Sequence, residues 1–402
     1  MKILVLNSGS SSVKYQMIDP EKNEFLAKGV VERIGMAGAM LTHKPKDKEQ
    51  VRLTGEILDH KVAIEYVLSI LLSKNHGVIK DKNEITAVGH RVVHGGESFS
   101  ASQLITSDVI KEIAHCIEFA PLHNPANLKG IRATQAILPD IPEVAVFDTA
   151  FHQTMPQEAF IYGLPFVLYK RHGIRRYGFH GTSHLYVSDR AAKMMKKPKN
   201  KIKIITCHLG NGCSVAAVRN GNSVDTSMGF TPLEGLLMGT RSGDIDPAVV
   251  LHIMNKEEMT MHEMNTLLNK HSGIQGLSGL SSDMREIEEA LDSNEQAWLA
   301  HQVFCYRLKK YIGAYAAAMN GADAIVFTGG IGENSSVVRW DTLKEMQYLG
   351  IEIDKKKNDK REKSEREIQT AKSKVKILII PTNEEMVIAR DTMTIVKNMN
   401  KQ

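Results

Sequence analysis

ILVLNSGSSSVKYQMI, residues 3–18, is the stretch that decides the fold. Its apolar, β-branched start runs into a turn at residues 7–12, and a second strand-like stretch follows from Val13 to Ile18. The pattern returns as KIITCHLGNGCSVAAV at residues 203–218, and each copy has an asparagine in its predicted turn, Asn7 and Asn211. Turns rich in Gly and Ser expose consecutive backbone N–H groups, which form concave anion sites. The recurrence predicts two similar halves, although β-hairpins of any function favour Asn-Gly turns.

Further strand-like runs lie outward from these two predicted hairpins. They cover residues 87–93, 143–147, 324–327 and 375–380, and helical patterns such as residues 298–320 lie between them. Strands that alternate with helices indicate an α/β fold. The length of 402 residues suits about two domains of roughly 200 residues each. We therefore expect two similar α/β domains that flank a nucleotide cleft.

Composition narrows the class of protein. Apolar residues make up 42% and charged residues 24%, which is ordinary for a globular protein, and no apolar run reaches the ~18 residues that span a membrane. The N-terminus lacks the apolar core of a signal peptide. The 4 cysteines have neither metal-site nor redox spacing, so we expect reduced thiols in the core and a cytoplasmic location.

The net charge of +5 comes largely from residues 355–376. Acidic residues dilute this tract, and it lacks aromatic side chains on which bases could stack. We interpret it as a solvated surface segment, with nucleic-acid binding as the alternative.

A candidate acid-binding motif is GHRVVHGG at residues 89–96. Along a strand Arg91 and Val93 share one face, so the guanidinium can take a carboxylate while the valine packs a short alkyl tail. A structural ion pair is the alternative for Arg91. Asp148 ends the strand-like run 143–147, where ligands of α/β sheets gather; capping of the next turn explains it equally well.

Other cations and carboxylates suit phosphate chemistry. Arginines and histidines crowd residues 175–184, and Arg241 lies in a Gly-bounded loop; transfer of a phosphoryl group needs such cations. Lys14 follows the first turn and can add a point charge. A Walker A loop and the protein-kinase signatures are absent from the sequence. Thr382 and Glu385 fit a capping box, which leaves Glu384 available for a metal.

Jointly these motifs resemble the acetate kinase family. The resemblance runs from residue 3 to residue 390 in family order and implies the actin-like fold of sugar kinases, actin and chaperone ATPases. It implies a homodimer, a first domain of residues 1–150 with 383–402, and a second, nucleotide-binding and dimerisation domain of residues 151–382. The matching motifs are NSGSSSVK (7–14), GHRVVHGG (89–96), PLHNP (121–125), FDTAFH (147–152), YGFHGTSH (177–184), HLGNG (208–212), TRSGD (240–244), DMRE (283–286), FTGGIGEN (327–334) and TNEE (382–385).

The resemblance also implies a role for individual residues, in four groups. The residues implied to bind Mg²⁺, with Mn²⁺ as a substitute, are Asn7 and Glu384; those implied to bind acetate are Arg91, Val93, Leu122, His123, Phe179 and Pro232. The residues implied to act in catalysis are Arg91, Asp148, His180 and Arg241. The residues implied to bind ATP are Lys14, His208, Leu209, Gly210, Asn211, Gly212, Asp283, Met284, Arg285, Ile331, Gly332, Glu333, Asn334 and Ser335.

The implied reaction is reversible transfer of the ATP γ-phosphoryl group to acetate by direct in-line attack, giving acetyl phosphate and ADP. Asp148 is a proton donor or acceptor in this family, but a carboxylate is already ionised at pH 7. We therefore expect Asp148 to orient Arg91 or a Mg²⁺-bound water.

The implied partners are acetate or acetyl phosphate and ATP or ADP, with no nucleic acid and no membrane. A propionate kinase is the nearest alternative, because one methylene discriminates by only ~1–3 kcal/mol. An ATP-driven switch of the actin type is the alternative from another class.

Overall fold

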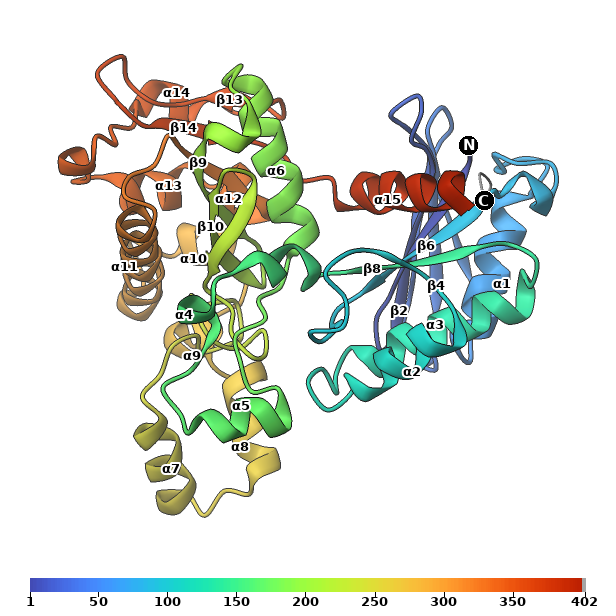
Figure 1. The fold of residues 1–402 in the computed structure, drawn as a ribbon, viewed down its shortest axis with the longest axis horizontal. Coiled ribbons are helices and arrows are strands. Elements are labelled where there is room, and N and C mark those ends of the chain that lie inside the picture. Colours follow the sequence, from blue (N-terminus) through green and yellow to red (C-terminus); the bar gives the residue numbers. More distant parts are fainter. Residues whose placement is uncertain (400–402) are drawn as a thin grey trace. The chain divides into compact units, whose positions relative to one another are not determined.

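The computed structural model describes residues 1–399 and divides into two compact units (Figure 1). Unit 1 comprises residues 1–150 and the segment from Asn383 onward, and unit 2 comprises Phe151–Thr382. Residues 400–402, which the sequence assigns to the first domain, lie outside the described residues.

Unit 1 is built on an 8-stranded sheet of order β5-β4-β3-β2-β1-β6-β8-β7. β1 and β2 form an antiparallel hairpin, and β1, β6 and β8 run parallel. The elements of unit 1 are β1 (Ile3–Ser8), β2 (Ser12–Asp19), β3 (Glu24–Glu32), β4 (Met40–Pro45), β5 (Val51–Thr54), α1 (His60–Leu71), η1 (Lys82–Glu84), β6 (Ala87–Val92), β7 (Gln103–Leu104), α2 (Ser107–His115), α3 (Asn124–Ile137), β8 (Glu143–Phe147) and α15 (Glu384–Met399), with η2 (Ala150–Thr154) at the boundary between the units.

Alternation along β1 divides the core of unit 1 into two layers. Leu4 and Leu6 pack with α1 and α3 on one face, whereas Ile3 and Val5 pack with α15 on the other. Figure 1 shows α15 lying along β6 in this unit. A Cβ atom on Gly89 of β6 would come within 2.5 Å of Thr392 Oγ1, so glycine is what allows α15 to approach the strand this closely.

Unit 2 is built on a 6-stranded sheet of order β11-β10-β9-β12-β14-β13. α6 packs on one face of this sheet and α11 on the other (Figure 1). Its elements are α4 (Gln157–Phe160), α5 (Phe166–His172), α6 (Gly181–Met194), η3 (Lys199–Lys201), β9 (Lys203–Leu209), β10 (Cys213–Arg219), β11 (Asn222–Thr226), α7 (Pro247–Lys256), α8 (Met261–Lys270), α9 (Gly273–Ser278), α10 (Met284–Glu289), α11 (Glu295–Ala318), β12 (Ala324–Thr328), α12 (Gly329–Asn334), α13 (Ser336–Leu343), η4 (Gln347–Leu349), α14 (Lys355–Asp359), β13 (Arg366–Glu367) and β14 (Lys376–Ile379).

The two sheets repeat one arrangement, which confirms the α/β class and the internal repeat. The order β3-β2-β1-β6-β8 in unit 1 matches β11-β10-β9-β12-β14 in unit 2: each has an antiparallel hairpin followed by parallel strands. The prediction that Asn7 lies in the turn is wrong, whereas Asn211 does lie in the turn between β9 and β10. Asn7 lies inside β1 opposite Lys14, and the register places His208, opposite Ser214, at the matching position of unit 2.

Two further local predictions need correction. The final helix begins at Glu384, and Asn383 Oδ1 caps it by accepting from Met386 N at 3.2 Å. The capping box of Thr382 and Glu385 is therefore wrong; the Thr382 hydroxyl instead forms a hydrogen bond with Ser183 Oγ at 2.9 Å. The basic tract 355–376 is largely exposed but not merely a solvated segment, because Asn358 and Ile368 within it are fully buried.

The cysteine prediction is confirmed: all of Cys116, Cys207, Cys213 and Cys305 are buried free thiols. Burial raises the pKa of the Cys305 thiol to about 12, so it stays protonated at neutral pH. Within residues 1–399, none of the helices combines the length and apolar character needed to cross a membrane.

Candidate active site

The carboxyl ends of three parallel strands in unit 1 bring together Asn7, Arg91 and Asp148. Val5, Gly89 and Val146, two residues earlier on the respective strands, face α15. Because side chains alternate along a strand, the three polar residues share that face. Asp148 lies one residue beyond β8, but its N–H donates to Val92 O at 3.0 Å and so continues the ladder. The topology therefore places one polar side chain at the end of each strand.

Arg91 and Asp148 form a bidentate ion pair. Arg91 Nε donates to Asp148 Oδ1 at 3.1 Å and Nη2 donates to Oδ2 at 2.6 Å. The Asp148 side chain is 1% exposed and that of Arg91 is 23% exposed, so the carboxylate lies beneath a partly accessible guanidinium. Burial opposes the charge of Arg91, but Asp148, Glu384 and Glu385 outweigh it and raise the pKa of Arg91. Within residues 1–399, Nη1 of Arg91 forms no hydrogen bond.

The start of α15 adds two carboxylates near this pair, Glu384 and Glu385. Burial raises the pKa of Glu385, and the negative charge of Glu384 raises it further, whereas Arg91 and Lys14 oppose the change. Lys14 is exposed on β2 directly opposite Asn7, so its ammonium group stands at the same end of the sheet. The cluster mixes cations and carboxylates in a way that suits a bound metal–phosphate group.

Asn7 and Glu384 fit a magnesium site of the open kind. Among the residues described, 1–399, no three or more His, Cys, Asp or Glu side chains cluster as a metal cage. Mg²⁺ bound with a nucleotide typically takes one or two protein carboxylate or amide oxygens, several waters and the substrate phosphates. The amide oxygen of Asn7 and the carboxylate of Glu384 are oxygen donors of this type, so the chemistry of the donor set agrees with Mg²⁺.

The loops beside Arg91 carry the other residues predicted to bind acetate in unit 1. β6 ends at Val92, so the strand alternation used to place Val93 stops one residue short of it. Val93 is 5% exposed, Leu122 is 52% exposed, and His123 precedes α3 at its N-cap position. Val93 therefore directly follows the strand that carries Arg91, and Leu122 has an apolar side chain exposed at the surface.

Two buried asparagines of α3 hold these loops, and sequence reasoning missed both. Asn127 Oδ1 accepts from Val93 N at 3.1 Å, and its Nδ2 donates to Ser8 O at 2.9 Å. Asn124 exchanges two hydrogen bonds with the His94 backbone, at 3.2 and 3.0 Å. The signal in the sequence was the pair of asparagines three residues apart, which places both amides on one helix face.

In unit 2, the side chains of Arg241 and His180 both lie next to the backbone of Gly212. A Cβ atom on Gly212 would lie 3.5 Å from Arg241 Nη1 and 3.5 Å from His180 Cε1, so glycine leaves both side chains accessible there. Arg241 Nη1 donates to Pro232 O at 3.2 Å. Within residues 1–399 Arg241 has no carboxylate partner, and burial lowers its pKa, partly offset by Cys213. A half-buried cation without a counter-ion is a site for an anion.

A network of histidines and hydroxyls supports His180. His180 Nδ1 shares a hydrogen bond with Ser214 Oγ at 2.9 Å, and its ring stacks on that of His208 with centroids 4.3 Å apart. His184 Nε2 contacts the same Ser214 hydroxyl at 2.7 Å. Burial, followed by His152 and His208, lowers the pKa of His184 well below its usual range, so His184 is a neutral support.

Phe179, predicted to line the acetate pocket, is 1% exposed and belongs to the same network. Its carbonyl oxygen contacts His152 Nε2 at 3.0 Å, and His152 Nδ1 contacts Ser223 Oγ at 2.7 Å. Burial lowers the pKa of His152 to about 4, partly offset by this backbone contact. The segment that carries Phe179 and His180 is thus fixed by a neutral, buried imidazole.

The predicted nucleotide loops of unit 2 also lie together. Gly239 N donates to Asn211 O at 3.0 Å, and a Cβ atom on Gly239 would lie 3.3 Å from Ser282 O, so the turn 210–212 and the segment 282–285 meet at Gly239. Asp283 caps α10 and binds the Arg285 guanidinium, with Nη2 to Oδ2 at 2.6 Å. The Arg285 side chain is 85% exposed, whereas Met284 is buried.

The predicted loop 329–335, which includes the residues assigned to ATP, forms the short helix α12 (Gly329–Asn334) followed by Ser335, and it passes the end of β9. Gly329 has φ +78°, and a Cβ atom there would lie 2.7 Å from Leu209 O, so glycine is required. Glu333 Oε1 accepts from Gly329 N at 3.0 Å and from Thr382 N at 3.3 Å. Ser335 Oγ caps α13 by accepting from Val338 N at 2.9 Å. Both side chains have structural partners, so backbone groups are the part of this loop best placed for a ligand.

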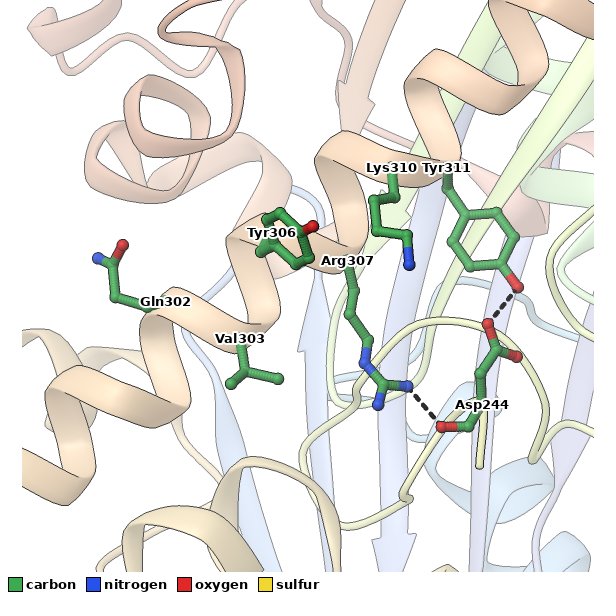
Figure 2. A pocket seen from close by; sticks show the side chains of 7 residues that line it. All are labelled: Asp244, Gln302, Val303, Tyr306, Arg307, Lys310 and Tyr311. Atoms are coloured by element: carbon green, nitrogen blue, oxygen red, sulfur yellow. Dashed lines mark hydrogen bonds between the residues drawn. The ribbon is translucent and has the colours of Figure 1, made fainter. Parts of the chain in front are cut away.

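The loop that carries Arg241 is braced by α11, as Figure 2 shows. Arg307 Nη1 donates to Asp244 O at 2.6 Å, and Tyr311 OH donates to Asp244 Oδ2 at 2.7 Å. Asp244 Oδ1 accepts from Gly235 N at 2.8 Å and closes the loop. Asp244, Arg307 and Tyr311 line a cavity of ≈ 630 Å³ whose lining includes none of the predicted site residues, so this cavity is not the proposed site.

Residues 2–390 match the model of the acetokinase family, and the chain belongs to that family. Its two actin-like units therefore make up a phosphotransferase whose acceptor is a carboxylate.

Acetate and propionate kinases are similar to this chain over nearly its full length. The chain is 57% identical to an acetate kinase of Caldanaerobacter subterraneus subsp. tengcongensis, over 99% of this chain and 100% of that protein. Among solved structures, an acetate kinase of Porphyromonas gingivalis is 50% identical with a TM-score of 0.94, covering 98% of this chain and 99% of that one. A propionate kinase of Francisella tularensis is 44% identical with a TM-score of 0.91 and the same coverage.

Proposed function

We propose that this chain is an acetate kinase, which transfers the γ-phosphoryl group of ATP reversibly to acetate and yields acetyl phosphate and ADP. The observation that carries the proposal is Arg91: buried Asp148 holds its guanidinium in a fork and leaves Nη1 for a ligand carboxylate. An arginine oriented in this way is suited to bind a small carboxylate. Val93, Leu122, His123, Phe179 and Pro232 complete the proposed acetate site.

The chemical step needs no base. Acetate is ionised at pH 7, so one of its oxygens attacks the γ-phosphorus directly while the bond to the bridging oxygen of ADP breaks. Charge spreads over the transferring phosphoryl oxygens, and Arg91, His180 and Arg241 neutralise it. Asp148 acts by orienting Arg91. The lack of a counter-ion at Arg241 supports this role, because its charge is left for the substrate.

Nucleotide and metal sites follow from the loops already described. Lys14 and residues 208–212, 283–285 and 331–335 bind ATP, with unit 2 as the nucleotide-binding domain. Asn7 and Glu384 hold Mg²⁺, with Mn²⁺ as a substitute. When bound, the metal neutralises phosphate charge.

We also propose that the protein is a cytoplasmic homodimer that associates through unit 2. The buried free thiols support a reducing compartment. Large apolar side chains exposed on unit 2, among them Trp298 and Tyr306 of α11 at 50% and 64%, support association through this unit. Light scattering that gives the mass of a single 44.7 kDa chain would exclude the dimer.

Arginine variants test the proposed reaction. Removing a cation that faces developing charge costs several kcal/mol, so Arg91→Ala and Arg241→Ala should each lose roughly 10³-fold in rate. Arg91→Ala should in addition raise the KM for acetate. Arg171→Ala is the matched control, because this arginine is exposed on α5 and outside the proposed site. Near-normal turnover of both site variants would refute the assignment.

A propionate kinase is the second candidate. The solved propionate kinase of Francisella tularensis shares 44% identity with the chain, so the fold serves both acids. Values of kcat/KM for the two acids distinguish these functions.

A further inference from the structure

The basic tract 355–376 carries a buried asparagine in its first helix, α14. Asn358 is 0% exposed, whereas Lys355, Lys356 and Lys357 on the same helix are exposed. Its Nδ2 donates to Ser336 O at 2.8 Å, at the start of α13. Its Oδ1 accepts from Arg339 Nε at 2.8 Å. The amide of Asn358 therefore attaches the tract to α13.

Among residues 1–399, Arg339 is the largest side chain that is fully buried, at 1% exposure. Its Nη1 donates to Gly332 O at 2.8 Å, and its Nη2 donates to Asn358 O at 3.1 Å. Across residues 1–399 no carboxylate forms an ion pair with it. Burial, with Arg366 adding to it and the charges of Glu288 and Asp359 opposing it, lowers the pKa of Arg339 to about 10, so the group remains charged at neutral pH.

A buried guanidinium without a counter-ion opposes folding, and an apolar side chain would fill the same space without that penalty. What arginine adds here is its fork of donors to Gly332 and Asn358. Gly332 lies where α12 packs against the sheet, because a Cβ atom on it would lie 3.4 Å from Phe327 C and 3.6 Å from Cys207 O. The hydrogen bond from Arg339 to Gly332 O therefore holds α12 at this point of the sheet.

We infer that Arg339 and Asn358 are positioning residues for nucleotide binding: they hold Gly332 of α12, within the loop segment 331–335 that begins in this short helix, in its binding-competent place. The inference rests on the proposed function, which assigns this loop to ATP. It gives the basic tract a role in the enzyme, because its first helix supplies Asn358 to the clamp. Neither side chain is required to touch ATP, so both act through the backbone of Gly332.

Asn358→Ala and Arg339→Lys test the clamp. Asn358→Ala removes the acceptor of Arg339 Nε, and lysine cannot span two partners as the guanidinium does. If the loop then occupies its competent place about a tenth of the time, the apparent Kd for ATP rises roughly tenfold. Lys357→Ala is the matched control: Lys357 lies on the same helix, but its ammonium group donates to Gln369 O at 2.9 Å and forms no hydrogen bond with Arg339 or Gly332.

The measurements are the Kd for ATP by equilibrium titration, the KM for ATP, the KM for acetate, kcat and the melting temperature. We expect the ATP constants to rise roughly tenfold in both clamp variants, with kcat and the KM for acetate within about twofold of wild type. Lys357→Ala should keep the wild-type ATP constants even if its melting temperature falls.

An unchanged Kd for ATP in folded Asn358→Ala would overturn the inference, as would equal losses in ATP and acetate parameters. If Arg339→Lys does not fold, Asn358→Ala alone decides. A wild-type enzyme that binds no ATP or shows no acetate-dependent turnover would instead overturn the proposed function.

Discussion

Asp148→Asn tests how Arg91 is held. The change keeps the shape of the side chain and removes its charge. Asparagine can accept from Arg91 with one oxygen only, and its NH₂ group faces the other guanidinium donor, so one of the two hydrogen bonds at 3.1 and 2.6 Å is lost. A hydrogen bond to a charged group is worth ~1.5–3 kcal/mol, so kcat/KM for acetate should fall roughly 10- to 150-fold.

The assay is steady-state turnover at saturating ATP and Mg²⁺ with acetate varied, at pH 6, 7 and 8. A positioning role predicts the same fold-loss at each pH, with the KM for ATP near wild type. Asp391→Asn is the control, because Asp391 is a half-buried carboxylate of unit 1 that accepts from Ser102 Oγ at 2.6 Å and not from Arg91. A loss that shrinks steadily as pH rises would show that Asp148 transfers a proton and would refute the reasoning.

Three other variants probe the alkyl site, the metal site and acid stability. Val93→Ala should raise the propionate-to-acetate ratio of kcat/KM about fourfold, since one more buried methylene is worth ~0.8 kcal/mol; an unchanged ratio in the folded enzyme would remove Val93 from the site. Glu384→Ala should raise the Mg²⁺ concentration needed for half-maximal rate without unfolding the protein, because Asn383 supplies the helix cap; an unaltered Mg²⁺ titration would contradict the ligand role. The pKa of His152 in the folded protein is lowered to about 4, so the stability from its neutral form is complete above pH ~6.5 and is lost as pH falls toward 4, at up to ~1.4 kcal/mol per pH unit. His152→Gln, whose amide can still reach Phe179 O, should flatten that slope in urea unfolding; an equal slope in both proteins would mean that other groups cause it.

Much of the fold could be predicted because it depends on local patterns. The hairpin at residues 3–18 and its recurrence at 203–218 indicated two similar sheets, and the order β3-β2-β1-β6-β8 of one sheet matches β11-β10-β9-β12-β14 of the other. The meeting of Arg91 and Asp148 also followed from general rules, since carboxyl ends of neighbouring parallel strands share an edge. The structure reveals their bidentate contact.

Other features depend on contacts between distant residues, which local patterns do not report. The amide of Asn127 binds the backbone of Val93, 34 residues away, and of Ser8, 119 residues away, and the sequence around Asn127 indicates neither partner. The cap of the last helix is Asn383 and not the predicted Thr382, because the Thr382 hydroxyl forms a hydrogen bond with Ser183, 199 residues away. Composition likewise marked residues 355–376 as basic surface and gave no sign of the buried Asn358.

The measurement that tests the central claim most directly is kcat/KM for acetate, propionate and butyrate with ATP and Mg²⁺ in one coupled assay of ADP formation. An acetate kinase predicts the highest value for acetate, a lower one for propionate and the lowest for butyrate, with no ADP formed when the acid is left out. A higher value for propionate than for acetate would make the protein a propionate kinase. ADP formation that proceeds equally without any carboxylate would contradict phosphoryl transfer to an acid altogether.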